Sequence, residues 1–220
     1  MTLPARDQER KGGDSMAGRP EMELIDEELA RRAQAGCRAS FEILAQRYQV
    51  PLLRFVDQRI RSTADAEDIV QDTLVRAYRR IDRYRDTWRF STWIFTIAHR
   101  LAISHMRSAG RRESHREDAV QHDAARSVPR EPGRDLMDRE SRQRFWEMAQ
   151  GALTEEQFAA VWLFYVEEMN AKDIAIVLGR SWVSVKTMLF RARARLESRL
   201  REMSPEARLV LIPVPSRVGL

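Results

Sequence analysis

Residues 170–196, NAKDIAIVLGRSWVSVKTMLFRARARL, carry the most specific structural signal in the chain. Asn170 and Asp173 form a pair like a capping box, which predicts the start of a short helix. Gly179 can take a positive φ in the turn that follows, and Ala175 is small enough for two helices to cross closely. The apolar residues that would hold the second helix at this crossing are Val185 and Met188. This pattern predicts a helix-turn-helix.

The second helix of this motif carries a basic surface. The residues predicted to face outward are Lys186, Thr187, Phe190 and Arg191, followed by Arg193, Arg195, Arg199 and Arg201. Such a surface suits base reading and phosphate contact in DNA. The alternative is an ordinary helical hairpin whose arginines form a solvated face. The cap, the small residue, the turn glycine, the apolar contacts and the one-sided charge all agree, and this favours DNA binding.

Helical spacing of apolar residues recurs upstream of this motif, whereas strand signals are nearly absent. We therefore predict an all-α fold of two small helical domains joined by a flexible linker. The helices are expected over about 26–35, 40–60 with a kink at Pro51, 65–81, 90–106 and 154–166, with renewed helical periodicity from Leu136. Predicted N-caps are Asp26, Ser40, Ser91 and Thr154, and Gly36 is expected to end the first helix.

The segment 108–135 contains no Leu, Ile, Met or aromatic residue, so we predict a flexible linker there. Segments 1–22 and 204–220 are expected to be tails, the second alternatively an extra interaction segment. The N-terminal residues lack the apolar stretch of a signal peptide, and the longest apolar run, 158–166, is shorter than the roughly 20 residues of a membrane span. We expect a cytoplasmic protein with no membrane insertion.

Composition limits the chemistry. The 38 Lys and Arg residues exceed the 33 Asp and Glu residues, and the net charge of +5 is compatible with a polyanionic partner. The single cysteine, Cys37, excludes an intramolecular disulfide and a cysteine-only zinc site. The histidines, expected at the surface, show no metal-binding spacing; they are His99, His105, His115 and His122. No phosphate loop or nucleophile elbow is present, so no catalytic residue, metal or cofactor is predicted.

Aromatic and basic residues alternate over 76–112. Exposed rings stack on unpaired bases while arginines follow the phosphates, so this mixture suits single-stranded nucleic acid. Tyr84 and Trp88 lie in a polar loop and are the predicted stacking residues. Phe90 and Trp93 are expected to belong mainly to the helix core.

Taken together, these residues resemble the extracytoplasmic-function (ECF) class of bacterial RNA polymerase sigma factors. The resemblance covers about residues 23–203. Its segments, in order, are ASFEILAQRYQVPLLRFV, DAEDIVQDTLVRAYRRIDRYR, FSTWIFTIAHRLAISHMR, LTEEQFAAVWLFYVEEMNAKDIAIVLG and SVKTMLFRARARL. It implies a sigma region two over 23–107, the linker over 108–135 and a sigma region four over 136–203.

The resemblance also implies partners and contact residues. Core RNA polymerase, through the β′ clamp helices and the β subunit, would be bound by Asp68, Gln71, Asp72 and Val75. The acids among these residues could instead form a solvated helix start that complements the helix dipole. Promoter DNA at the minus-ten element would be bound by Tyr84, Arg85, Trp88, Arg89, Arg100 and Ser104. DNA at the minus-thirty-five element would be read by Lys186, Thr187, Phe190 and Arg191, with Thr187 alternatively on phosphate.

An anti-sigma factor is a further partner that the resemblance implies. The sequence departs from the family pattern at Arg100 and Ser104, where many members carry Asn, and at Trp182 and Met188, so the promoter sequence does not transfer. The start codon is open among Met1, Met16 and Met22. The alternative function is a stand-alone helix-turn-helix regulator, which would bind an operator without polymerase but leaves the acidic helix and the aromatic loop without a role.

Overall fold

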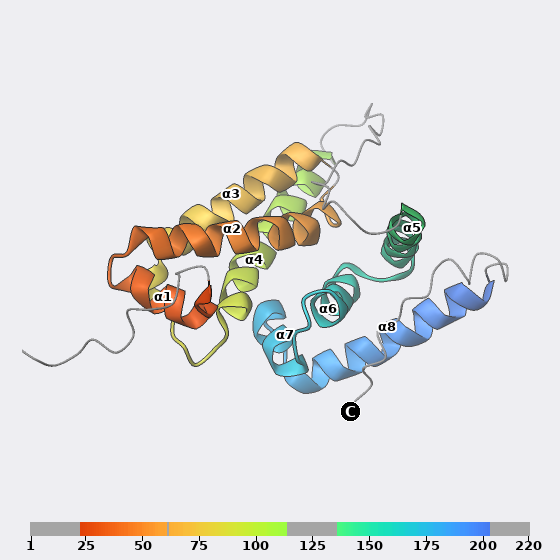
Figure 1. Cartoon of the computed structure of the whole chain (residues 1–220). Helices are drawn as coiled ribbons and strands as arrows, with labels where there is room; N and C mark the ends of the chain where they lie inside the picture. The colour runs from red at the N-terminus through yellow and green to blue at the C-terminus, as the bar shows by residue number, and fades with distance from the viewer. Residues whose placement is uncertain (1–22, 61, 114–135, 203–220) are drawn as a thin grey trace, which may run out of the picture.

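The computed structural model describes residues 23–60, 62–113 and 136–202, and every regular element in these ranges is helical. The N-terminal domain consists of α1 (Asp26–Gln34), α2 (Arg38–Asp57), α3 (Thr63–Arg79), the short 3-10 helix η2 (Ile81–Arg83) and α4 (Phe90–Glu113). The C-terminal domain consists of α5 (Leu136–Ala152), α6 (Glu155–Tyr165), α7 (Ala171–Leu178) and α8 (Trp182–Glu202). In Figure 1 the two groups lie side by side, with α7 next to α4. The predicted all-α fold is confirmed.

The core of the N-terminal domain forms where α1, α3 and α4 pack on α2. Leu44 and Leu52 of α2 are fully buried there. The rings of Phe55 and Phe95 meet edge to face with centroids 5.3 Å apart, which joins α2 to α4. Aromatic pairs in this arrangement stabilise a core beyond their buried area.

The core of the C-terminal domain forms around α6, whose residues Phe158 to Leu163 are all buried. Trp146 of α5 packs on Trp162 of α6 with ring centroids 4.7 Å apart. Val185 and Leu189 of α8 are buried in the same core. A short helix that is apolar on nearly every side needs neighbours all round, and α5, α7 and α8 supply them.

Two predicted helix starts are confirmed. Thr154 caps α6 through a capping box in which its hydroxyl accepts from the Gln157 backbone N–H and the Gln157 side chain accepts from the Thr154 N–H. Asn170 caps α7 by accepting from the backbone N–H groups of Lys172 and Asp173 at 2.9 and 3.0 Å. Both helices therefore begin where the local sequence dictates.

Three other predicted caps are wrong. Asp26 lies inside α1, and its carboxylate accepts from Arg47 at 2.6 Å and from the Tyr48 hydroxyl at 2.5 Å. Ser40 is buried in α2, where its hydroxyl donates to the sulfur of Cys37. Ser91 lies inside α4, which begins at Phe90. In the first two cases contacts inside the folded domain use the side chain that local sequence reasoning assigned to a cap.

Helix boundaries also differ from expectation at three places. The third helix begins at Thr63 because Ser62 caps it, accepting from the Asp65 N–H at 3.2 Å. The second helix, expected over about 40–60, spans Arg38–Asp57, with Pro51 inside it as expected. The fourth helix continues to Glu113, so the segment predicted as a linker from residue 108 begins as helix. The rest of that segment, both predicted tails, His115 and His122 lie outside the described residues. Within the described ranges, no helix combines the length and apolar character that crossing a membrane requires.

Candidate nucleic-acid interface

The helix-turn-helix is formed by α7, a turn at Gly179 and α8. Gly179 has φ +63°, in the left-handed region, and the Arg180 N–H donates back to the Ala175 carbonyl at 2.9 Å. This is the closing bond of a Schellman-type C-cap, which glycine accommodates without strain. Val185 is fully buried and Met188 packs partly against the core. The turn residue and the apolar contacts are therefore as the sequence predicts.

The outward side of α8 carries the four residues expected to read DNA. All four are exposed; they are Lys186, Thr187, Phe190 and Arg191. Phe190 is 72% exposed, a large apolar ring that contacts little of its own domain. The Lys186 ammonium lies 4.9 Å from the centroid of the Trp182 ring, and the Thr187 hydroxyl donates to the Val183 carbonyl at 3.1 Å. Cations, a hydroxyl and an exposed ring on one helix face are suited to contact the edges of base pairs.

Not every basic residue of α8 is available for phosphate. The guanidinium of Arg193 donates to the Tyr165 hydroxyl at 2.8 Å and lies 5.3 Å from the centre of the Phe164 ring. Arg199 pairs with Glu202, and Arg201 with Glu197. The prediction that Arg193 faces a phosphate is therefore wrong in this structure, because the side chain fastens α8 to α6.

The loop between η2 and α4 is pinned to the domain core by Tyr84. Tyr84 was predicted to be an exposed stacking residue, yet it is 1% exposed, and this prediction is wrong. Its ring packs against Phe90 and Trp93 with centroids 5.6 and 5.5 Å away, and its hydroxyl donates to the Trp88 carbonyl at 2.9 Å. Burial raises the pKa of Tyr84 to about 12. The side-chain amide of Gln34 also donates to the Tyr84 carbonyl, at 2.9 Å.

The anchored loop presents its other predicted residues to solvent. Trp88 is 47% exposed, and Arg85 and Arg89 are exposed on either side of it. The Arg85 guanidinium donates to the backbone carbonyls of Asp82 and Tyr84 at 2.7 and 2.9 Å, so it helps Tyr84 to fix the loop, while Trp88 and Arg89 are exposed to solvent. Trp88 therefore remains a candidate stacking residue, whereas Tyr84 belongs to the core of the domain.

One face of α3 collects the residues expected to contact a protein partner. Asp68, Gln71, Asp72 and Val75 are all exposed, and their spacing of three and four residues places them on one side of the helix. Val75 is 40% exposed and Tyr78 extends the same apolar strip. The carboxylate of Asp72 pairs with Arg76 at 3.5 Å. An exposed apolar strip beside acidic side chains is suited to a basic, partly apolar partner surface.

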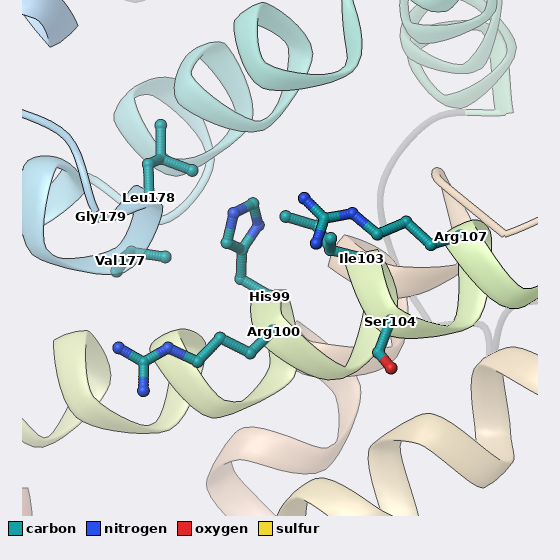
Figure 2. Close-up of a pocket in the computed structure, with 8 residues that line it drawn as sticks. All are labelled: His99, Arg100, Ile103, Ser104, Arg107, Val177, Leu178 and Gly179. Carbon is teal, nitrogen blue, oxygen red and sulfur yellow. The ribbon is translucent and has the colours of Figure 1, made fainter.

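The middle of α4 borders the C-terminal domain. Arg100 and Ser104, both exposed, lie at the edge of a cavity of about 800 Å³ between α4 and α7. Figure 2 shows the side chains of His99, Ile103 and Arg107 pointing from α4 toward α7, while Ser104 points away. The opposite wall is formed by Val177, Leu178 and Gly179. This DNA-contact candidate therefore shares its space with the other domain.

Sequence reasoning missed two residues beside this cavity. His99, expected at the surface, is 3% exposed, and its Nδ1 lies 3.1 Å from Nη1 of Arg59. Because a guanidinium can only donate, Nδ1 accepts and the imidazole is neutral. Burial and the nearby charges of Arg59 and Arg100 lower the pKa of His99 to about 3. No local motif marks either residue, since both are buried by segments distant in sequence.

The described residues include no cluster of three or more His, Cys, Asp or Glu side chains that could hold a metal ion. The acids of α3 point outward along one helix and do not converge. The described surfaces therefore offer binding through helix faces, an anchored loop and arginines.

Comparison with known proteins identifies both domains. The model of the family described as Sigma-70 region 2 matches residues 44–112, and that described as Sigma-70, region 4 matches residues 147–196. Together they span more than half of the chain. These matches contain the anchored loop, the α3 face and the helix-turn-helix.

Relatives with curated descriptions and solved structures extend the match to both domains at once. The RNA polymerase sigma-H factor of Pseudomonas aeruginosa is 28% identical over 83% of this chain and 97% of its own length. The ECF RNA polymerase sigma-E factor of Haemophilus influenzae is 28% identical over 82% and 98%. The sigma factor RpoE in complex with the anti-sigma factor NepR from Bartonella quintana has a TM-score of 0.60 at 26% identity, over 73% of this chain and 96% of that one. CnrH in complex with the cytosolic domain of CnrY has a TM-score of 0.59 at 25% identity, over 81% and 99%.

Proposed function

We propose that this chain, which belongs to the sigma-70 family and is an RNA polymerase sigma factor of the ECF type, divides promoter recognition among three of its surfaces. The α3 face binds core polymerase, the anchored loop with α4 binds the melted minus-ten element, and α8 reads the minus-thirty-five element. The observation that supports this division is that the residues of each predicted set, apart from Tyr84, are exposed: the first on α3, the second on the loop and α4, and the third on α8.

The α3 face would contact the β′ clamp helices of the core enzyme. Asp68 and Asp72 supply negative charge one helical turn apart, and Val75 supplies an apolar contact at the next turn. Complementary charge beside an apolar contact gives an interface its orientation and speeds association. The β subunit is expected to make further contacts outside this face.

The loop around Trp88 would capture an unpaired base of the melted strand. Stacking on an exposed ring contributes roughly 1 to 3 kcal/mol per base, and Arg85 and Arg89 would hold the adjoining phosphates. Arg100 and Ser104 would contact the same strand further along α4. Tyr84 acts here as a positioning residue, because it holds the loop in place without reaching the DNA.

The helix α8 would enter the major groove of the minus-thirty-five element. Lys186 and Arg191 can donate to guanine edges, and Phe190 can contact a thymine methyl group. The protein itself performs no catalytic step in this proposal, since the polymerase supplies the chemistry. It would act in the cytoplasm, with an anti-sigma factor as a further partner.

Binding to purified core polymerase, followed by run-off transcription on genomic DNA with core enzyme alone as control, tests this function. We expect new, discrete start sites that share a two-part upstream motif. Operator binding by the isolated protein, together with no binding to core enzyme, would instead identify a stand-alone regulator.

The polymerase contact has its own test. The double variant Asp68→Ala, Asp72→Ala should weaken binding to core enzyme at least about tenfold, because it removes two charges from one interface. Glu67→Ala is the matched control, since Glu67 is an exposed acid of the same helix just outside the face. Equal losses in the two proteins would show that general charge, and not this face, governs the interaction.

A further inference from the structure

The two domains meet at a contact that buries a charged side chain. Arg59 follows α2, and its side chain is only 1% exposed. Its Nε donates to the carboxylate of Glu155, in the first turn of α6. The two residues lie 96 positions apart, and the pair directly joins the N-terminal domain to the C-terminal domain. Such an ion pair needs both domains in their present positions.

Nε and Nη1 of the buried Arg59 guanidinium have hydrogen-bond partners, but Nη2 has none among the described residues. The guanidinium lies 5.0 Å from the centre of the Phe55 ring, and its Nη1 is bonded to the neutral His99. Its Nη2 is buried and has no hydrogen-bond partner among the described residues. A buried donor without a partner costs free energy, which water would recover if the domains separated. The unpartnered donor therefore reduces the net free energy by which this ion pair stabilises the closed arrangement.

A second titratable group of the C-terminal domain lies near the same boundary. Glu167, in the loop between α6 and α7, is partly buried and accepts a hydrogen bond from the Trp162 indole at 3.2 Å. Arg54 of α2 lies close enough for its charge to act on the Glu167 carboxylate. The N-terminal domain supplies arginines to this boundary, and the C-terminal domain supplies glutamates.

The same contact places α7 against the DNA candidate on α4. Val177 and Leu178 form the wall of the cavity opposite Arg100, as Figure 2 shows, whereas Ser104 points away from α7 and also borders a groove beside α3. A DNA strand that contacts Arg100 from this side of α4 would run into α7. By contrast, Lys186 and Phe190 on α8 are exposed, and neither lines this cavity.

We propose that the structure is a closed, self-inhibited form in which the ion pair of Arg59 with Glu155 holds α7 beside Arg100, on one side of the minus-ten surface of α4. The domains must separate at this pair before α4 can bind a melted strand. This inference rests on the proposed placement of minus-ten DNA along α4. The closed form itself is a property of the free protein and does not depend on any DNA contact.

Glu155→Gln tests the closed form. Small-angle X-ray scattering of the full chain should give a larger radius of gyration, and hydrogen exchange should rise in peptides that cover 99–107 and 171–179. We expect the equilibrium constant for closure to fall roughly tenfold, because removing one partner leaves the other as an uncompensated buried charge. Wild-type protein bound to core enzyme should show the same rise in exchange at 171–179.

Glu156→Gln is the matched control. Glu156 is the next residue in the first turn of α6, but it pairs with Arg180 inside its own domain at 2.5 Å. This variant should keep wild-type scattering and wild-type exchange at 99–107. Identical scattering of wild type and Glu155→Gln, or the same expansion in both variants, would overturn the proposal. Scattering and exchange are measured without DNA and test the closed form, whereas run-off transcription tests the proposed function. Either proposal can therefore be overturned while the other stands.

Discussion

The two surfaces proposed for promoter DNA differ in how far the rest of the molecule leaves them open. On α8, one side packs into the C-terminal domain and the opposite side is exposed, including Phe190. On α4, one side packs into the N-terminal domain, and a second side, near His99 and Ile103, faces α7. In this conformation the surface of α8 proposed for duplex DNA is open to solvent, whereas the surface of α4 proposed for the melted strand shares its space with α7.

This difference follows from how each helix is used in packing. The buried residues of α8 occupy one stripe, so its remaining circumference is solvated. The fourth helix buries Ile94, Phe95 and Ala98 against its own domain and places the adjacent His99 in the boundary between domains. A helix that packs on two sides retains only a narrow strip for a ligand.

The largest expected effect comes from removing the proposed base contacts on the exposed face of α8. The double variant Lys186→Ala, Arg191→Ala should lower transcription from promoters that depend on the minus-thirty-five element about a hundredfold, because each good base contact contributes roughly 1 to 3 kcal/mol. Run-off transcription at a fixed salt concentration measures this. Binding to core polymerase should be unchanged, since neither residue lies on the α3 face.

Arg38→Ala is the control for simple loss of positive charge, because Arg38 is an exposed arginine of α2 that pairs with Glu42. It should leave transcription unchanged. An equal fall in core binding by the double variant would contradict the division of work between α3 and α8.

The next effect concerns the boundary between the two domains, where Glu167 lies, and depends on pH. Burial raises the pKa of Glu167 from 4.5 to about 7, against the opposing effects of the Trp162 hydrogen bond and the Arg54 charge. The folded protein therefore favours the protonated carboxyl. This stabilisation is fully present below pH 4.5 and is lost as the pH rises through 7, up to about 3 kcal/mol in all.

Glu167→Gln should remove this loss, because the amide has no charge to bury. Urea unfolding at pH 5 and pH 8 gives the two free energies of unfolding for each protein. We expect the variant to gain stability over wild type at pH 8 relative to pH 5. A difference between the two proteins that stays constant with pH would show that Glu167 is ionised normally.

The smallest expected effect tests whether the anchored loop beside α4 captures a base. Trp88→Ala should slow formation of the open promoter complex roughly tenfold, because one stacking contact is lost. Tyr84→Phe removes only the buried hydroxyl that bonds the Trp88 carbonyl, and it should have a lesser effect. Permanganate footprinting of the melted region measures both. If Trp88→Ala melts promoters as well as wild type does, the ring is not a base-capture site.

Much of the candidate site follows from local sequence rules. Helical periodicity alone places Asp68, Gln71, Asp72 and Val75 on one face of α3. The exposure of Lys186 and Arg191 follows in the same way, once Val185 and Leu189 are assigned to the core. Exposed faces are predictable here because hydrophobic spacing records which side of each helix is buried. Tyr84 was mispredicted because a polar loop gives no sign that a ring will turn into the core.

By itself, the sequence determined the helices, the caps at Thr154 and Asn170, and the left-handed turn at Gly179, because each depends on residues within a few positions of one another. Only the tertiary structure decided that Arg59 and His99 are buried together and that α7 lies beside α4. Burial and pairing of charges depend on segments that meet only after folding. A guanidinium loses its hydration shell, and needs a partner such as Glu155, only when the second domain covers it.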